Sequence, residues 1–282
     1  MKHHVRLAAG AAAFAIIACD ALPVRAADHT NLEQGLPVVI EDAYPIKENG
    51  LEIQGYLRYD RVPRSDPDGR SRLFVVPRVE WGATKNFQLS VETPYAVGDA
   101  SETKQGAATV QGLYNLNTES LYLPAFAVAA GVSRPYGYRN GGTETELKFL
   151  ATKSLGTPDP EGTSPFSYVP RQIHFNASWF HNFDPLTGRD AERTDRYRVG
   201  VAYSQPVTNE LVVVADVYRE TDRDRRRASN MAEVGVRYLL TPQTVLSGSA
   251  GVGFGGDRNQ DFRFVAGIQH TLSYPFSFDP PR

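Results

Sequence analysis

The chain has 282 residues, and its 30 Lys and Arg residues against 32 Asp and Glu residues give a formal net charge of −2 at pH 7. This balance lacks the basic excess that proteins use against phosphate backbones, so nucleic acid is not an expected partner. The mean hydropathy of −0.37, without an apolar stretch of about 18 residues beyond the N-terminus, excludes a helical membrane protein.

Residues 1–26 have the pattern of a signal peptide, which predicts export. A basic start precedes an apolar run too short to span a bilayer, and small residues before Ala27 offer a cleavage site after Ala26. Lipoprotein-type processing at Cys19 is an alternative. Cys19 is the only cysteine, so a disulfide or a thiolate metal site is not expected.

Residues 27–50 show no clear periodicity and are predicted to be an extended lead-in. From residue 51 onward, apolar and polar residues alternate in short segments, as in 51–59, where Leu51 and Ile53 alternate with Glu52. This period of two is typical of strands with one apolar and one polar face. The predicted strands are 51–59, 72–81, 87–95, 107–116, 121–133, 144–153, 172–183, 196–204, 211–220, 232–240, 244–254 and 261–274.

An even number of two-faced strands in an exported chain indicates an all-β fold, a single twelve-stranded antiparallel transmembrane β-barrel over 51–282. Links after the even strands are mostly short and those after the odd strands longer, which predicts short periplasmic turns, longer external loops and both termini in the periplasm. The long link 154–171 is an exception. Pro77, Pro94 and Pro124 each remove a hydrogen-bond donor from a proposed strand or its end, so β-bulges are expected there.

Several stretches resemble the MetA-pathway of phenol degradation family of exported barrels. They are the lead-in 41–45, the opening strand 50–61, the run 77–95, and 142–156 with its core Glu-Thr-Glu-Leu-Lys. The resemblance implies a membrane-spanning barrel that passes small, sometimes aromatic, organic compounds. No catalytic residues carry over from it. No cofactor is expected.

If Leu51, Leu73 and Phe87 face lipid, the opposite faces of the strands line a lumen of mixed charge. That lumen is either a hydrated path whose charges tune what passes, or a space filled by paired charges. The predicted lumen-lining residues are Glu52, Gln54, Arg58, Arg78, Glu80, Gln88, Glu92, Gln111, Glu146, Lys148, His174, Asn176, Arg196, Arg198, Asp216, Glu233, Arg237, Arg263 and Gln269.

Catalytic and metal sites have little support in the sequence. His174, Asn176 and Ser178 share the inward face of one strand, but His174 and Ser178 would lie about 13 Å apart along it, too far for a hydrogen bond. His181 falls on the opposite face from His174, and His270 has no partner nearby in sequence, so no metal site is predicted. The protein is not expected to be an enzyme.

The loop around 219–227 is rich in arginine. If it is external, its guanidinium groups could bind phosphates of lipopolysaccharide, whereas a solvated hairpin is the simpler interpretation. The residues concerned are Arg223, Arg225, Arg226 and Arg227.

The sequence therefore predicts an outer-membrane channel for small solutes, embedded in lipid and lipopolysaccharide, with passive passage through a polar lumen. One alternative is a structural or adhesive barrel with a plugged lumen, and another is an outer-membrane hydrolase. A soluble β-sandwich is the rival fold, because alternation alone does not distinguish lipid from a protein core.

Overall fold

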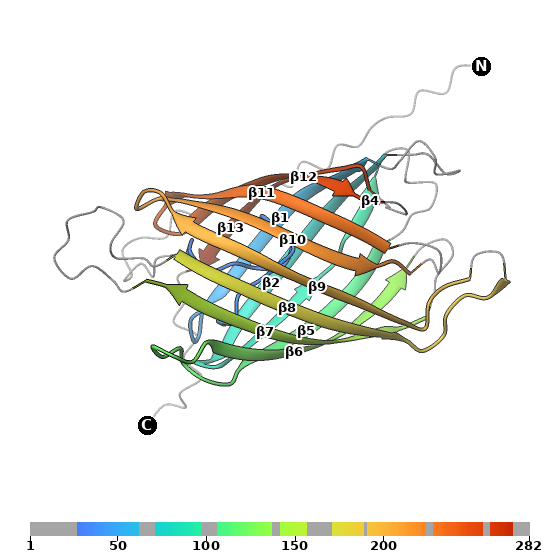
Figure 1. The fold of residues 1–282 in the computed structure, drawn as a ribbon, viewed down its shortest axis with the longest axis horizontal. Coiled ribbons are helices and arrows are strands. Elements are labelled where there is room, and N and C mark those ends of the chain that lie inside the picture. Colours follow the sequence, from blue (N-terminus) through green and yellow to red (C-terminus); the bar gives the residue numbers. More distant parts are fainter. Residues whose placement is uncertain are drawn as a thin grey trace, which may run out of the picture.

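The computed structural model describes residues 27–61, 71–97, 106–136, 142–156, 171–188, 191–223, 228–255 and 260–272, so the predicted signal peptide lies outside the described residues. The described chain is built of strands (Figure 1). They are β1 (Leu51–Arg61), β2 (Arg72–Thr84), β3 (Phe87–Glu92), β4 (Tyr95–Val97), β5 (Gly106–Asn115), β6 (Ala125–Tyr136), β7 (Glu144–Leu155), β8 (Arg171–Asn182), β9 (Asp195–Pro206), β10 (Leu211–Thr221), β11 (Ala228–Thr241), β12 (Thr244–Phe254) and β13 (Phe262–Leu272).

The strands form one closed antiparallel barrel. Each strand pairs with its neighbours in sequence, and β1 pairs with both β2 and β13, which closes the sheet. The short strand β4 continues β3, since both pair with β2 and β5 in one register, so the barrel has twelve strands. The predicted fold class is confirmed, and a β-sandwich is excluded because the sheet has no open edge.

The predicted bulge at Pro77 is wrong. Pro77 lies opposite Gly55 in an unbroken register between β1 and β2, and its carbonyl accepts a hydrogen bond from Thr93 N–H. On its other side, Thr93 and Pro94 form the break between β3 and β4. Pro77 thus lies opposite this break, whereas Pro94 faces β5, where its carbonyl accepts from Ala107 N–H at 3.3 Å. Register shifts occur instead near Gly82 in the β2–β3 pair and near Leu239 in the β11–β12 pair.

One strand begins later than predicted. The strand expected from residue 121 starts at Ala125, directly after Pro124, and residues 116–124 form a turn. The side chain of Asn117 closes this turn, because its amide donates to the Pro124 carbonyl and accepts from Phe126 N–H. Local hydrogen bonds of the Asn117 side chain thus take the place of the strand pairing that the alternating pattern predicted for these residues.

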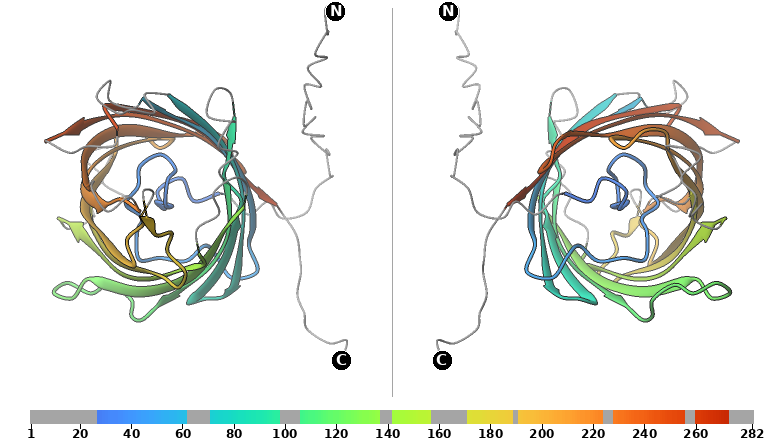
Figure 2. Two further views of the ribbon diagram at one scale, coloured as in Figure 1. Left: turned by 90° about the vertical axis from the view of Figure 1, so that its right-hand side faces the viewer. Right: turned by 90° about the vertical axis from the view of Figure 1, so that its left-hand side faces the viewer.

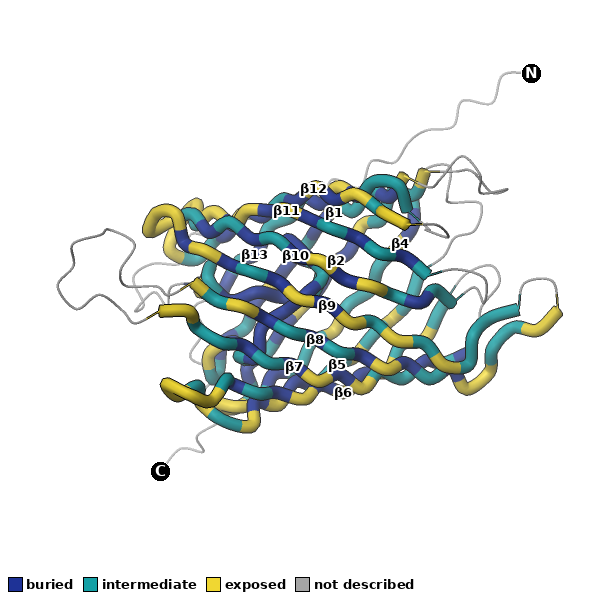
Figure 3. The backbone as a smooth tube through the Cα atoms, viewed as in Figure 1, coloured by how far each residue is buried: buried dark blue, intermediate teal, exposed yellow. Residues whose placement is uncertain are grey.

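The outer surface of the barrel is an apolar belt. Along strands such as β11 and β12, more exposed residues alternate with buried ones (Figure 3). Large apolar side chains point outward at mid-strand, among them Val234, 60% exposed, and Leu147, 56% exposed. Trp179, Tyr197 and Tyr238 are also exposed on this surface. An apolar outer band with aromatic side chains is what a barrel presents to lipid. No helix among the described residues has the length and hydropathy needed to cross a bilayer.

The residues predicted as a lead-in lie inside the barrel. Leu51 pairs with Leu272, so β1 and β13 place the two ends of the barrel chain at one rim. From that rim, residues 27–50, here called the N-terminal segment, fold back into the lumen, where Figure 2 shows them as the blue trace crossing the ring. Most of the segment is buried, including Leu32, Leu36 and Ile40.

A lipid-facing exterior predicts that the cost of an introduced charge depends on depth. We expect Val234→Arg, at the middle of β11, to destabilise the barrel in lipid by about 2–4 kcal/mol. Leu240→Arg, near the end of the same strand and also exposed, should cost about 0–1 kcal/mol. Reversible folding into lipid bilayers under denaturant measures both values. Equal costs at the two positions would contradict a lipid-facing belt along β11.

Candidate functional site

The predicted lumen-lining residues all lie buried or half-buried on the inner side of the wall. For example, Glu52 and Gln54 are buried on β1, while Ile53 and Leu57 on the same strand are exposed. The inner face therefore gathers charged side chains from every part of the barrel. What sequence reasoning did not anticipate is that several of these side chains, such as Lys148, Asn176 and Arg237, contact the N-terminal segment rather than open space.

The middle of the N-terminal segment is held by side chains of the wall. Asp216 on β10 accepts hydrogen bonds from Val39 N–H and Ile40 N–H at 3.0 and 3.2 Å. Asn176 on β8 makes a reciprocal pair with Glu41, accepting from its N–H at 3.0 Å and donating to its carbonyl at 2.8 Å. These bonds satisfy backbone groups that would otherwise be buried without a partner. The wall thus supplies the partners that a neighbouring strand would normally provide.

The end of the segment nearest β1 is bound in the same way. Thr152 accepts from Ala43 N–H at 2.9 Å, and Asn115 donates to the Ala43 carbonyl at 2.7 Å. Gln88 accepts from Ile46 N–H at 2.8 Å. Partners from β3, β5 and β7 therefore follow the segment along the wall.

Arg237 fastens the start of the segment. This side chain on β11 is fully buried. Its guanidinium donates to the carbonyls of His29 and Leu36 at 3.0 and 2.9 Å, and to Gln269 Oε1 at 2.7 Å. The planar guanidinium thus donates three hydrogen bonds, and these join the segment to β13.

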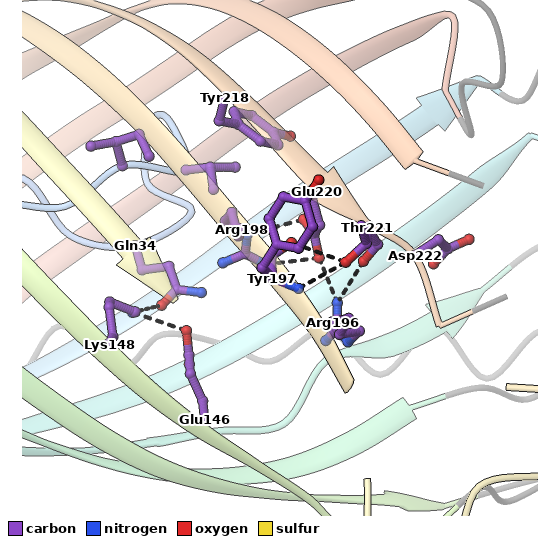
Figure 4. A network of polar contacts seen from close by, with 12 residues as sticks. Gln34, Glu146, Lys148, Arg196, Tyr197, Arg198, Tyr218, Glu220, Thr221 and Asp222 are labelled. Atoms are coloured by element: carbon purple, nitrogen blue, oxygen red, sulfur yellow. Dashed lines mark hydrogen bonds and ion pairs between the residues drawn. The ribbon is translucent and has the colours of Figure 1, made fainter. Parts of the chain in front are cut away.

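Lys148 on β7 provides the main ionic contact with the segment. Its Nζ lies 2.5 Å from Glu41 Oε1 and also donates to Gln34, while Glu146 Oε1 is 3.6 Å away. Figure 4 shows the contacts with Gln34 and Glu146. Both Lys148 and Glu41 are buried. A buried pair of this kind is costly to break from one side, because the remaining charge has no partner.

Asp42 braces the segment internally. Its carboxylate accepts hydrogen bonds from Leu32 N–H and Tyr44 N–H, each at 2.9 Å, and so ties together two parts of the turn. Burial raises the pKa of Asp42 to about 8, and the two backbone hydrogen bonds oppose that rise. The segment is therefore a compact loop rather than a loose tail.

Apolar side chains of the segment occupy apolar patches on the inner wall. Leu36 packs with Tyr56, Val76 and Val265, in one of several such clusters. Ile40 packs with Tyr218 and Met231 in another, and Leu32 and Val38 with Val212 and Val214 in a third.

Two glycines make room for these side chains. A Cβ added at Gly200 would lie 2.7 Å from Ile40 Cδ1, and one at Gly267 would lie 2.7 Å from Leu36 Cδ1. The wall is thus shaped to receive the segment closely.

The segment separates two cavities. The first lies toward the rim away from both chain ends, and it is called the outer cavity here because the sequence predicts that this rim is external. It has a volume of about 310 Å³ and is lined by Arg58, Phe74, Tyr218 and Glu220, with Gln34 of the segment. The other, near the start of β1, has a volume of about 110 Å³ and is lined in part by residues from Asp28 to Gly50. A solute crossing the barrel would have to displace part of the segment that lies between them.

Arginine–carboxylate pairs surround the outer cavity. Arg196 and Arg198 both bind Glu220, at 2.7 and 3.0 Å, as Figure 4 shows. Arg263 binds Asp60 at 2.8 Å. Such pairs hold the guanidinium groups in fixed positions along the cavity wall.

Arg58 is more exposed than the three arginines just described. Its guanidinium lies over the Phe74 ring, 4.4 Å from the centroid, and its Nε forms an ion pair with Asp60 at 3.2 Å that lacks the geometry of a hydrogen bond. It is 29% exposed. Arg58 is therefore a guanidinium beside an aromatic ring that remains accessible to a solute.

The residues considered for hydrolysis are not joined in a catalytic arrangement. His174 is fully buried, with Nδ1 3.1 Å from Thr152 Oγ1 and Nε2 2.9 Å from Ser204 Oγ. Ser178 Oγ has no hydrogen-bond partner, and Asn176 binds Glu41 of the segment. Both ring nitrogens of His174 are thus committed to hydroxyls of the wall.

The arginine-rich loop is described only in part. Arg223 lies 3.4 Å from Glu192 and donates to the Gly142 carbonyl at 3.3 Å. Arg225, Arg226 and Arg227 lie outside the described residues. The proposed contact with lipopolysaccharide stays a prediction.

Comparison with known proteins supports the fold. No family model matches the chain, and no curated protein matches it in sequence. The COG4313 outer membrane channel from Pseudomonas putida F1 matches with a TM-score of 0.58 and 12% identity, over 82% of this chain and 98% of that chain. The NanC porin matches with 0.53 and 11%, over 79% and 100%, and the KdgM porin with 0.50 and 11%, over 78% and 99%.

The chain has the fold of an outer-membrane β-barrel. At such low identity these similarities show the fold alone, and they agree with the closed barrel and its apolar belt. Residence in the cell outer membrane follows from that fold and that belt. The specific resemblance to the MetA-pathway family is not confirmed.

The ionic contact of Lys148 predicts a way to loosen the segment. Lys148→Met leaves Glu41 buried without its cation, which costs about 3–5 kcal/mol when a buried pair is broken from one side. With Ala43→Cys as a reporter in a Cys19→Ser background, we expect maleimide labelling of the folded barrel to become at least about tenfold faster. Lys85→Met, at an exposed turn, is the control and should leave the rate unchanged. An unchanged rate in Lys148→Met would contradict this role.

Proposed function

We propose that the protein is an outer-membrane channel for small solutes, in which the N-terminal segment controls the path. The observation that carries the proposal is the position of the segment, between an outer cavity of about 310 Å³ and an inner cavity of about 110 Å³. The similarity of the whole chain in fold to outer-membrane channels and porins supports the same function.

The way the segment is held makes displacement feasible. Among the described residues its only strand-like pairing is an internal bridge between Glu33 and Leu36, so it is not part of the barrel ladder. Backbone hydrogen bonds join it to the barrel at its two ends, from Ala27 to Pro242 and from Asn49 to Gly82. Between these ends, its contacts with the wall are side-chain hydrogen bonds, ion pairs and apolar contacts. When the segment moves, the polar groups on the wall can bind water in the lumen, so each hydrogen bond contributes only about 0.5–1.5 kcal/mol.

The outer cavity supports a class of solute. Arg58 over Phe74 offers a guanidinium for a carboxylate and a ring face for an aromatic group, and the rings of Tyr56 and Tyr218 line the same cavity. Small aromatic acids match both features. We therefore propose organic anions with an aromatic ring as the solutes that enter from outside.

The alternative role is a structural or adhesive barrel whose lumen stays plugged. The occupied lumen is compatible with it, because a permanently fixed segment would look the same in one conformation. The two functions differ in whether the folded barrel conducts once the segment is removed.

Removal of the segment predicts a larger conductance. In planar bilayers we expect the full chain to conduct weakly, and a variant lacking 28–45 to conduct several-fold more, since the two cavities then join. Heat-modifiable gel migration verifies that the variant is folded. A turn variant, Thr208→Ala, is the control, because this exposed residue is remote from the lumen. A folded but silent deletion variant would favour the structural role.

Block by benzoate tests the proposed solute class. We expect added benzoate to reduce ion current through the channel, and Arg58→Gln to raise the half-blocking concentration about tenfold, because hydrogen bonds to a charged group contribute about 1.5–3 kcal/mol. Arg134→Gln is the matched control, since Arg134 is an exposed arginine that does not line the outer cavity. Equal block of both variants, or none in the unmodified protein, would contradict aromatic acids as solutes.

A further inference from the structure

Three buried carboxylates meet where the N-terminal segment touches the first two strands. Glu33 comes from the segment, Glu52 from β1 and Glu80 from β2. One oxygen of each lies within 4.8 Å of the others, and the three side chains are only 3–5% exposed. Glu52 and Glu80 also face each other directly in the register of β1 and β2. Like charges placed opposite each other in a sheet are destabilising unless something lies between them.

The protein's own cations only partly neutralise this cluster. Arg78 Nη1 lies 3.6 Å from Glu80 Oε1, but the same guanidinium also binds Glu92. Glu52 accepts hydrogen bonds from two neutral side chains, Gln269 at 2.6 Å and Thr271 at 3.0 Å. Two carboxylates of the three therefore have neutral or shared partners.

Of the three carboxylates, Glu33 has the fewest partners to offset its negative charge. Its Oε1 is buried and has no hydrogen-bond partner, and its other oxygen accepts from Gln54. The position therefore lacks a positive charge.

The side-chain amide of Gln54 lies at the same place. Gln54 is 2% exposed, and its amide group lies between Glu33 and Glu80, with Nε2 3.1 Å from Glu80 Oε2. Its Oε1 is buried without a hydrogen-bond partner. A half-turn about the last side-chain bond places Oε1 where Nε2 now lies, facing both carboxylates. An amide oxygen beside carboxylates is a set of ligands that a hard cation prefers.

We propose that Glu33, Glu52, Glu80 and Gln54 form a binding site for a divalent cation, with calcium as the preferred ion. All four donors are oxygens, and they come from three separate segments, so the site has the flexible geometry that Ca²⁺ accepts. Mg²⁺ requires near-ideal octahedral geometry and gives up its waters reluctantly, which disfavours it at a crowded buried position.

A cation here fastens the N-terminal segment to the barrel wall. Glu33 is the only one of the four residues that belongs to the segment, so the ion bridges the segment to β1 and β2 at one point. This inference rests on the proposed function only in its consequence, that calcium holds the channel in its occluded state. Calcium binding itself is measured without any conductance.

Calorimetry on the full-length folded protein in detergent tests the site. Titration with CaCl₂ in chelator-treated buffer should show one saturable site, with a dissociation constant of about 10⁻⁴–10⁻³ M, the range of extracellular calcium sites. Glu33→Gln should weaken binding at least about tenfold, because ligand charge count sets affinity. Glu144→Gln is the matched control, since Glu144 is a buried lumenal carboxylate with its own partner, Arg196 at 2.6 Å, and should bind calcium as before.

Further measurements guard against a variant that fails to fold. Gln54→Ala keeps all three carboxylates and should still lower calcium affinity. In the Ala43→Cys, Cys19→Ser reporter protein with an intact calcium site, removal of calcium with a chelator should speed maleimide labelling several-fold. No saturable binding by the folded protein, or equal affinity in Glu33→Gln, would overturn the site. Binding that leaves the labelling rate unchanged would overturn its role as a fastening.

Discussion

The rest of the structure depends on one constraint, that every backbone donor and acceptor in the bilayer must find a partner within the protein. Closure of β1 onto β13 satisfies it for the strands, and the period of two then sends one set of side chains to lipid and the other inward. The inner set does not fill the lumen alone. The N-terminal segment occupies the remaining space, and its own backbone groups must be satisfied by the wall. Asp216, Asn176 and Arg237 do this work at the centre of the barrel.

Two interpretations of the charged lumen apply at different depths. At the level of the segment, side chains such as Lys148 and Arg237 are committed to the segment, so this part is a filled lumen. Toward the outer rim, Arg58 keeps an accessible guanidinium above Phe74 beside a cavity. Charge in the lumen therefore has two roles, one in holding the segment and one in meeting what enters. The inward-facing positions alone do not distinguish these two roles. The position of a residue in a strand determines which face its side chain is on, but not which group that side chain contacts.

The sequence predicts the barrel well and the filling of its lumen poorly. Alternation is a local signal, so strand positions and the face of each residue follow from it, and the error at Ala125 arises where Asn117 closes a turn instead. The N-terminal segment has no periodicity, and many of its partners are more than 100 residues away, as for Glu41 and Lys148. A signal was nevertheless present in Leu211–Val214, where four apolar residues break the alternation. Val212 and Val214 face inward and receive Leu32 and Val38.

The polar and apolar contacts of the segment contribute differently to the occluded state. If the segment leaves, Asp216 and Asn176 meet water in the lumen, so each lost hydrogen bond costs only about 0.5–1.5 kcal/mol. Leu36 and Ile40, both fully buried, would instead expose their side chains, at about 1.5–3 kcal/mol each. Apolar burial therefore supplies much of the stability of the occluded state. The hydrogen bonds and ion pairs fix where the segment lies, because only one position satisfies them together.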